Sequence, residues 1–144
     1  MTLGRVFVDT GAWIALQDSE DRLHGAAADT FPALLQACGS LVTTNCVVGE
    51  TYTYLRMEEG YAAARRFVDG LGDTAKLERT FVTDAVARDA SQILHRSAEH
   101  PFRFVDATSF ALMRQERIRY TFAFDAHFRT AGFMRIPLDV RLPA

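Results

Sequence analysis

The sequence predicts a single α/β domain over residues 1–144, with a mostly parallel central sheet covered by helices. Three observations lead to this fold class. Short apolar, β-favouring segments alternate with segments whose apolar residues recur every three or four positions. No repeat, low-complexity tract or Pro/Gly/Ser-rich linker divides the 144 residues, a length that suits one domain. Hydrophobic residues make up 49% of the chain, which is enough for a core and excludes a disordered protein.

The first third of the chain predicts two strands separated by helices. Arg5–Val8 is apolar and β-favouring, and the short segment Gly11–Leu16 that follows predicts a helix. Within Leu23–Cys38 the apolar spacing predicts a longer helix, which Gly39 and Ser40 end. The second predicted strand, Leu41–Thr44, follows at once.

The middle of the chain continues the alternation. Asn45 is predicted to be the N-cap of a helix that runs through Leu55. A further helix is predicted over Tyr61–Leu71, where a Gly-Asp pair ends it. Lys76–Val82 has strand character, and Thr83 is the predicted N-cap of a helix that extends almost to a His-Pro pair.

The last third completes the pattern. FRFVDATSFALM predicts a helix with Ala107 and Phe110 on its apolar face, and the aromatic segment Tyr120–Phe124 predicts a strand. A short helical stretch and a last strand at Arg135–Leu138 follow. In such sheets, ligands bind outside the carboxyl ends of the strands.

Charge, cysteines and hydropathy exclude several classes of protein. The net charge of −2 argues against a strongly basic nucleic-acid binder, and Lys76 is the only lysine, a bias that fits codon usage better than phosphate recognition. Cys38 and Cys46 lack zinc-site spacing and are expected to be reduced thiols. We find no signal peptide and no membrane span, which predicts a cytoplasmic protein without a membrane partner.

Three acids follow apolar, β-favouring residues and precede small residues: Asp9, Asp106 and Asp125. For each one taken alone, helix N-capping is an equally good interpretation. Asp9 and Asp125 also follow predicted strands, so they are expected at the same edge of the sheet. Carboxylates that converge there would repel one another unless a cation neutralised them, and oxygen ligands favour Mg²⁺ or Mn²⁺.

Glu50 is the fourth candidate, because it lies early in a helix among uncharged residues and beside Gly49. The alternative is a surface glutamate favoured by the helix dipole. The four histidines show no ligand spacing, and His127, although near Asp125, is interpreted as a packing or capping residue.

Together these motifs resemble a known family. VFVDTGAWIAL, VVGETYTYL, FVDATSFALM and FAFDAHFRTAGF are similar, in order and approximate spacing, to the motifs of PIN-domain nucleases, and most of all to the VapC-type toxins of bacterial toxin–antitoxin pairs. The resemblance covers nearly the whole chain. It implies an α/β/α sandwich, metal-dependent ribonuclease activity, an antitoxin partner and a homodimer.

The resemblance also assigns residues. Asp9, Glu50, Asp106 and Asp125 match the acidic quartet that holds Mg²⁺ or Mn²⁺ and carries out catalysis, and Thr10 matches a hydroxyl residue of the substrate site. The chain departs from the family's pattern at two positions. Ala123 stands where many relatives carry Ser or Thr, and Ala126 stands where many carry a basic residue.

The expected reaction is hydrolysis of an RNA phosphodiester by a water that the cation activates and orients. Glu50 is the candidate base for the proton of that water. Arg114 and Arg129 are candidates for binding substrate phosphates, with a solvated helix end as an equal alternative. A non-catalytic PIN-like binding module, or a PIN nuclease outside any toxin–antitoxin pair, remains the alternative function.

Overall fold

The computed structural model describes residues 3–143, which build a five-stranded sheet in the order β3-β2-β1-β4-β5. All four strand pairs are parallel, and Phe7 of the central strand pairs with Val42 on one side and Thr121 on the other. The strands are β1 (Arg5–Val8), β2 (Ser40–Thr44), β3 (Leu77–Thr80), β4 (Tyr120–Phe122) and β5 (Met134–Ile136).

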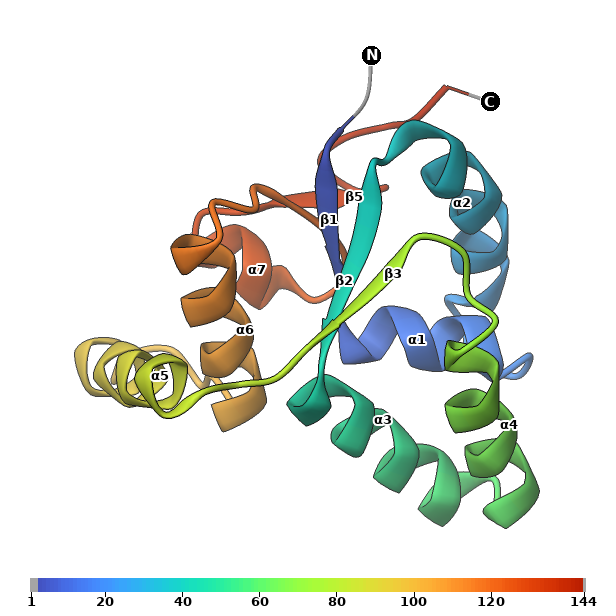
Figure 1. Cartoon of the computed structure of the whole chain (residues 1–144), viewed down its shortest axis with the longest axis horizontal. Coiled ribbons are helices and arrows are strands. Elements are labelled where there is room, and N and C mark those ends of the chain that lie inside the picture. The colour runs from blue at the N-terminus through green and yellow to red at the C-terminus, as the bar shows by residue number, and fades with distance from the viewer. Residues whose placement is uncertain (1–2, 144) are drawn as a thin grey trace.

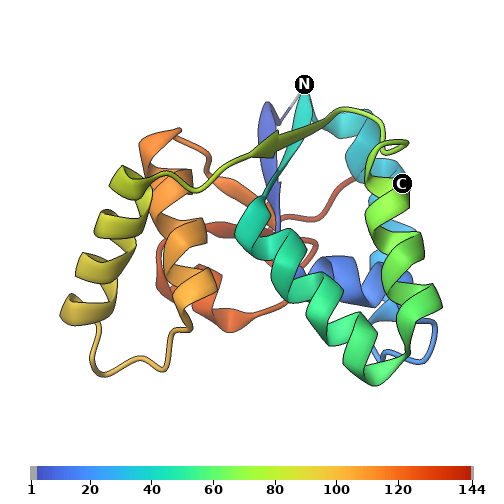
Figure 2. The ribbon, with the colours of Figure 1, turned by 60° about the horizontal axis from the view of Figure 1, so that its bottom comes forward.

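Helices cover both faces of the sheet (Figure 1). They are α1 (Thr10–Gln17), α2 (His24–Ala37), α3 (Asn45–Glu58), α4 (Tyr61–Leu71), α5 (Asp84–Arg96), α6 (Phe104–Gln115) and α7 (Ala126–Thr130). In Figure 1, α1, α2 and α4 lie on one side of the sheet, α5, α6 and α7 lie on the other, and α3 lies below the carboxyl ends of the strands. Figure 2 shows α5 outside α6, farther from the sheet. This arrangement confirms the predicted α/β/α sandwich.

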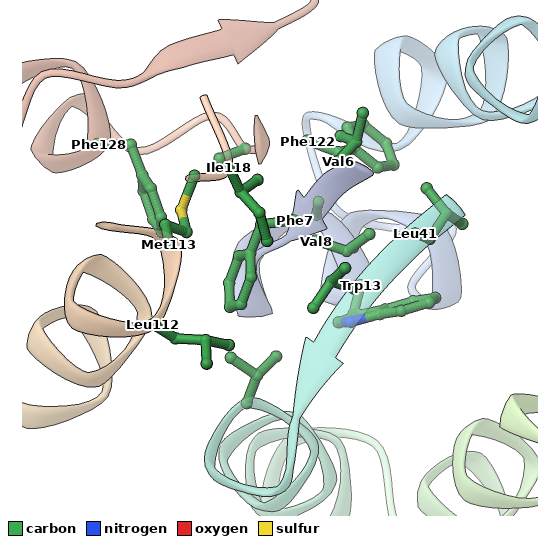
Figure 3. Packing of buried hydrophobic residues seen from close by; sticks show 14 of the residues in the cluster. Val6, Phe7, Val8, Trp13, Leu41, Leu112, Met113, Ile118, Phe122 and Phe128 are labelled. Carbon is green, nitrogen blue, oxygen red and sulfur yellow. The ribbon is translucent and has the colours of Figure 1, made fainter. Parts of the chain in front are cut away.

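The central strand β1 supplies side chains to both layers of the core. Val6, Phe7 and Val8 are fully buried, and successive strand residues point to opposite faces. Figure 3 shows Phe7 on the side of Met113 and Phe128, with Val6 and Val8 on the opposite side, toward Phe122 and Trp13. A strand buried on both faces explains why its sequence is a continuous apolar run.

An aromatic cluster fixes α6 against α7. The ring of Phe110, which is fully buried, lies edge-on to those of Phe102 and Phe128 at 5.1 and 5.0 Å between centroids. Phe110 lies one helical turn after Asp106, and Phe128 directly follows His127. Packing of these rings therefore holds the polar side chains next to them in place.

Most predicted element boundaries differ from the structure by one or two residues, and the last strand, predicted at Arg135–Leu138, is observed at Met134–Ile136. Asn45 is not the N-cap of α3: Thr44 is, and its hydroxyl accepts a hydrogen bond from the Val47 amide at 3.1 Å. The Asn45 side chain instead accepts one from the Val82 amide, so a long-range contact outcompeted local capping. Strand β3 stops at Thr80, before the exposed Phe81, and β4 stops at Phe122. Within residues 3–143, no helix has the length and apolar character needed to cross a membrane.

Replacing Thr44 by Val is expected to lower the free energy of unfolding by about 1 kcal/mol. The two side chains have nearly the same shape, but Val cannot accept the hydrogen bond that the Val47 amide donates to Thr44. The amide is buried at the start of α3, so it would be left without a partner. Urea-induced unfolding followed by circular dichroism measures the change. An unchanged midpoint would show that this hydroxyl contributes nothing to capping.

Candidate active site

Two of the candidate acids lie at the point where the order of the strands in the sheet reverses. The chain leaves β1 toward β2 and β3 on one side, whereas β4 and β5 lie on the other, so β1 and β4 flank the switch point of this parallel sheet. Asp9 directly follows β1, and Asp125 follows β4 after two more residues. Both therefore lie at the carboxyl edge, as the sequence predicted.

The other two acids come from helices. Asp106 lies in the first turn of α6 and does not precede the helix, so it is not an N-cap; its carboxylate accepts a hydrogen bond from the Arg103 amide at 2.9 Å. Glu50 lies in the second turn of α3, with 27% of its side chain exposed. Asp9 holds the N-cap position of α1, yet its side chain makes no capping hydrogen bond. Asp125 does cap α7, through the His127 amide at 2.8 Å.

All four acids line one cavity of about 250 Å³, and Thr10 lines it with them. A second groove, along α3, also has Glu50 and Tyr54 in its lining, so the cavity adjoins a longer surface depression. The structure thus brings together every acid that the sequence singled out, from four separate elements.

The carboxylates of this cavity affect the protonation of Asp9. Burial first, then the nearby carboxylate of Asp106 and to a smaller degree those of Asp125 and Glu50, together raise the pKa of Asp9 from 3.8 to about 7, against a lowering by hydrogen bonding at the Thr10 backbone. Asp9 is 5% exposed. A buried carboxyl surrounded by three others holds its proton near neutral pH unless a cation replaces that proton.

The donor atoms fit a divalent cation. Thr10 Oγ1 is buried and has no hydrogen-bond partner within residues 3–143, although buried hydroxyls are nearly always paired. It lines the same cavity as the four carboxylates, which are hard oxygen donors. An unpaired buried hydroxyl beside mutually repelling acids is what a site for Mg²⁺ or Mn²⁺ would present.

His127 lies beside two of the candidate acids, a position that the sequence interpretation ranked below packing or capping. Its Nδ1 lies 3.4 Å from Asp106 Oδ2 and 3.5 Å from Asp125 Oδ1. Its ring also packs edge-on against Phe102, at 5.2 Å between centroids. The packing interpretation is therefore incomplete: one edge of the imidazole packs, and the other faces two acids. The short Asp-Ala-His spacing at the start of a helix was the available signal.

Arg103 and Tyr54 also line the acidic cavity. Arg103 Nη1 lies 3.9 Å from Glu50 Oε2, and 76% of the Arg103 side chain is exposed. Arg103 was one of several arginines near the acids in sequence, and its position three residues before Asp106 could have distinguished it. An exposed cation at the mouth of an acidic cavity is suited to contact a phosphate.

Arg114 and Arg129 do not line this cavity. Arg114 lines a separate groove between α5 and α6, donates to the Ala131 carbonyl at 3.1 Å and lies over the Phe133 ring. Arg129 Nη1 lies 3.9 Å from Asp139 Oδ1. Any contact of theirs with substrate would therefore lie outside the acidic cavity, and it stays a prediction.

Comparison with known proteins gives a consistent result. Residues 6–134 match the model of the PIN domain. The 23S rRNA-specific endonuclease VapC20 of Mycobacterium tuberculosis, from strains CDC 1551 / Oshkosh and ATCC 25618 / H37Rv, is 36% identical over 132 residues, which is 91% of this chain and 97% of that protein.

Solved structures show the same similarity. A crystal structure of M. tuberculosis VapC20, described as a sarcin-ricin loop cleaving toxin, covers 90% of this chain with a TM-score of 0.82 and 35% identity; 96% of that chain is covered. VapBC2 from Rickettsia felis, bound to a DNA fragment from its promoter, has a TM-score of 0.67 at 8% identity over 91% of this chain and 96% of that chain, which shows a shared fold only.

The parallel sheet with acids gathered at its switch point agrees with these similarities. This chain belongs to the PIN-domain family, and it is similar to VapC20 over nearly its whole length. The family and the fold class predicted from the sequence are both confirmed.

Proposed function

We propose that this protein is a divalent-metal-dependent endoribonuclease and the toxin of a toxin–antitoxin pair. The observation that carries the proposal is the convergence of Asp9, Glu50, Asp106 and Asp125 in one cavity, around a buried carboxyl whose pKa is near 7. The endonuclease name of the relative at 36% identity supports the same reaction class, with ribosomal RNA as the first substrate to test. A cytoplasmic location is part of the proposal, because ribosomal RNA is found there.

The site residues take distinct roles in this proposal. Asp9, Asp106, Asp125 and Glu50 would hold Mg²⁺ or Mn²⁺, which would supply Lewis acidity to neutralise charge developing on the scissile phosphate. Asp9 and Asp106 are the buried ligands and fix the position of the cation, with Thr10 as a neighbouring hydroxyl donor. Glu50 lies on α3 and is more exposed than Asp9 and Asp106, and it accepts the proton of the attacking water.

Incubation of the purified protein with ribosomes and with protein-free 23S rRNA tests the proposal. Cleavage at a few discrete sites with Mg²⁺ or Mn²⁺, and none with EDTA, is expected. Absence of cleavage in every metal condition, for both substrates, would favour a non-catalytic PIN-like module that binds RNA or protein. Cleavage without toxicity on expression in cells would favour a nuclease outside any toxin–antitoxin pair.

Two protein partners belong to the proposal, an antitoxin and a second copy of the chain. Exposed apolar side chains support the proposal of these two partners. Met57 is 76% exposed, Phe81 is 75% exposed and Tyr61 is 55% exposed. A contiguous patch of such side chains would mark a surface that binds another protein. Light scattering gives the mass of the isolated protein, and co-expression with the product of the adjacent reading frame tests for an antitoxin.

Arg103→Glu is expected to weaken binding of a short RNA at least tenfold, because it replaces the cation at the mouth of the acidic cavity by a repelling charge. Arg114→Glu, which lies in a different groove, is the matched comparison. Binding is measured by fluorescence anisotropy in EDTA, so that cleavage does not interfere. An equal loss in both variants, or in Arg129→Glu, would instead support phosphate steering by arginines beyond the cavity.

A further inference from the structure

Asp106, Asp125 and His127 form the tightest group of potential metal ligands in residues 3–143. One ligand atom from each lies within 4.8 Å of the other two, and no other set of three or more His, Cys, Asp or Glu side chains in that range meets this condition. Asp9 and Glu50 line the same cavity but lie outside the group. The closest arrangement therefore contains an imidazole nitrogen as well as carboxylate oxygens.

The contacts of His127 with the two acids are too long for well-formed hydrogen bonds. Nδ1 lies 3.4 Å from Asp106 Oδ2 and 3.5 Å from Asp125 Oδ1. Hydrogen bonds from nitrogen to oxygen span about 2.7 to 3.2 Å, and charged ones are at the short end. The nitrogen is thus nearly equidistant from two oxygens and is paired closely with neither.

These separations suit ligands that share a cation. Ligands about 2.1 Å from an octahedral ion are about 3.0 Å apart when adjacent and about 4.2 Å apart when opposite. The two distances from His127 Nδ1, 3.4 and 3.5 Å, fall between these values. A contraction of a few tenths of an ångström would bring the nitrogen and each oxygen to adjacent coordination positions.

The orientation of the ring is fixed by residues outside the site. The His127 ring lies edge-on to Phe102, which in turn lies edge-on to the buried Phe110. The His127 amide is bound by the Asp125 carboxylate at 2.8 Å, which ties the backbone of the two residues together. With 27% of its side chain exposed, His127 is held in place with its Nδ1 beside Asp106 and Asp125.

We propose that His127 supplies a nitrogen ligand, through Nδ1, to the divalent cation that Asp106 and Asp125 hold, and that this nitrogen makes the site select Mn²⁺ over Mg²⁺. The inference rests on the metal dependence in the proposed function. Mg²⁺ strongly prefers oxygen ligands and retains its waters, whereas imidazole suits transition ions better. A mixed nitrogen and oxygen donor set therefore shifts the preference toward Mn²⁺.

Pulsed electron paramagnetic resonance of Mn²⁺ bound to the full-length protein tests this directly. Modulation from a coordinated nitrogen is expected, and it should change when the protein is made with ¹⁵N-histidine. His127→Gln should abolish the nitrogen signal and weaken Mn²⁺ binding about tenfold, while Mg²⁺ binding changes less than about threefold.

His100→Gln is the matched control, because His100 stacks on the same Phe102 ring and its imidazole pairs with Glu99. It should retain both the nitrogen signal and the Mn²⁺ affinity. Bound Mn²⁺ that shows no histidine nitrogen, in a wild-type protein whose Mn²⁺ binding is lost on Asp106→Asn, would overturn the inference and leave the proposed function intact. A wild-type protein that binds Mg²⁺ but no Mn²⁺ would also overturn the inference alone, and one that binds neither ion would overturn both.

Discussion

Asp106→Asn is expected to reduce RNA cleavage at least about a thousandfold, a loss of about 4 kcal/mol of transition-state stabilisation, while the protein stays folded. Asp106 is 7% exposed, lines the acidic cavity and contacts His127, so its charge serves the site. Asn has the same shape and still offers an oxygen to the Arg103 amide, which keeps the first turn of α6 intact. Single-turnover cleavage of RNA with saturating Mn²⁺ measures the effect.

Asp84→Asn provides the matched control, since Asp84 also lies in the first turn of a helix but does not line the cavity. It should cleave RNA at the wild-type rate. Thermal unfolding of both variants separates a catalytic loss from a folding defect. Cleavage by Asp106→Asn within tenfold of the wild type would show that the acids stabilise helix termini and are not the catalytic machinery.

The fold was predictable because its signals are local and redundant. The continuous apolar run of β1 and the three- to four-residue periodicity of α2 each specify one element, and alternation of such elements specifies a parallel sheet. The N-cap of α3 was misassigned because Thr44 and Asn45 are both good capping residues. Only the contact between Asn45 and Val82, far away in sequence, decides between them.

The acids of the site were predictable for a different reason, because a carboxylate that ends an apolar run costs free energy unless something compensates it. Asp9 and Asp125 follow from the rule on strand ends alone. Arg103 and His127 do not follow an apolar run in a way that costs free energy, so the sequence gives no comparable signal for them. An arginine at a helix start and a histidine after an N-cap are ordinary on a surface. Their spacing from Asp106 and Asp125 in the sequence was a weak signal, whereas their proximity to Glu50 and Asp106 in the structure comes from packing of α6 against α3 and α7, which one-dimensional patterns do not encode.

Metal-free protein is expected to lose stability as the pH rises from 5 to 8. The pKa of Asp9 is 3.8 in an ordinary setting and about 7 in the folded protein, so over most of this range the folded state binds a proton that the unfolded state has released. Unfolding is then favoured by each increase in pH, and the free energy of unfolding falls by about 3 kcal/mol until the pH passes the folded pKa.

Other shifted carboxyls do not mask this trend. The pKa values of Glu78 and Asp139 are lowered, chiefly by hydrogen bonds from Ser40 and from Arg135. Their stabilisation is present above the ordinary carboxyl pKa and is lost only as the pH falls toward their folded values, below the range from 5 to 8. Urea unfolding in EDTA at pH 5, 6, 7 and 8, for the wild type and for Asp9→Asn, isolates the contribution of Asp9. The variant should show no such fall.

Mn²⁺ should reverse the loss in the wild type, because a cation binds the deprotonated carboxylate that high pH produces. At a hundredfold excess over its dissociation constant, bound Mn²⁺ adds about 2.7 kcal/mol, which is close to the stability that the buried charge removes. The increase in the free energy of unfolding on addition of Mn²⁺ should be large at pH 8 and small at pH 5 in the wild type. It should be absent in Asp9→Asn at either pH. A wild-type protein that is equally stable at pH 5 and pH 8 in EDTA would show that folding does not raise the pKa of Asp9. An equal effect of Mn²⁺ on wild type and variant would place the cation elsewhere.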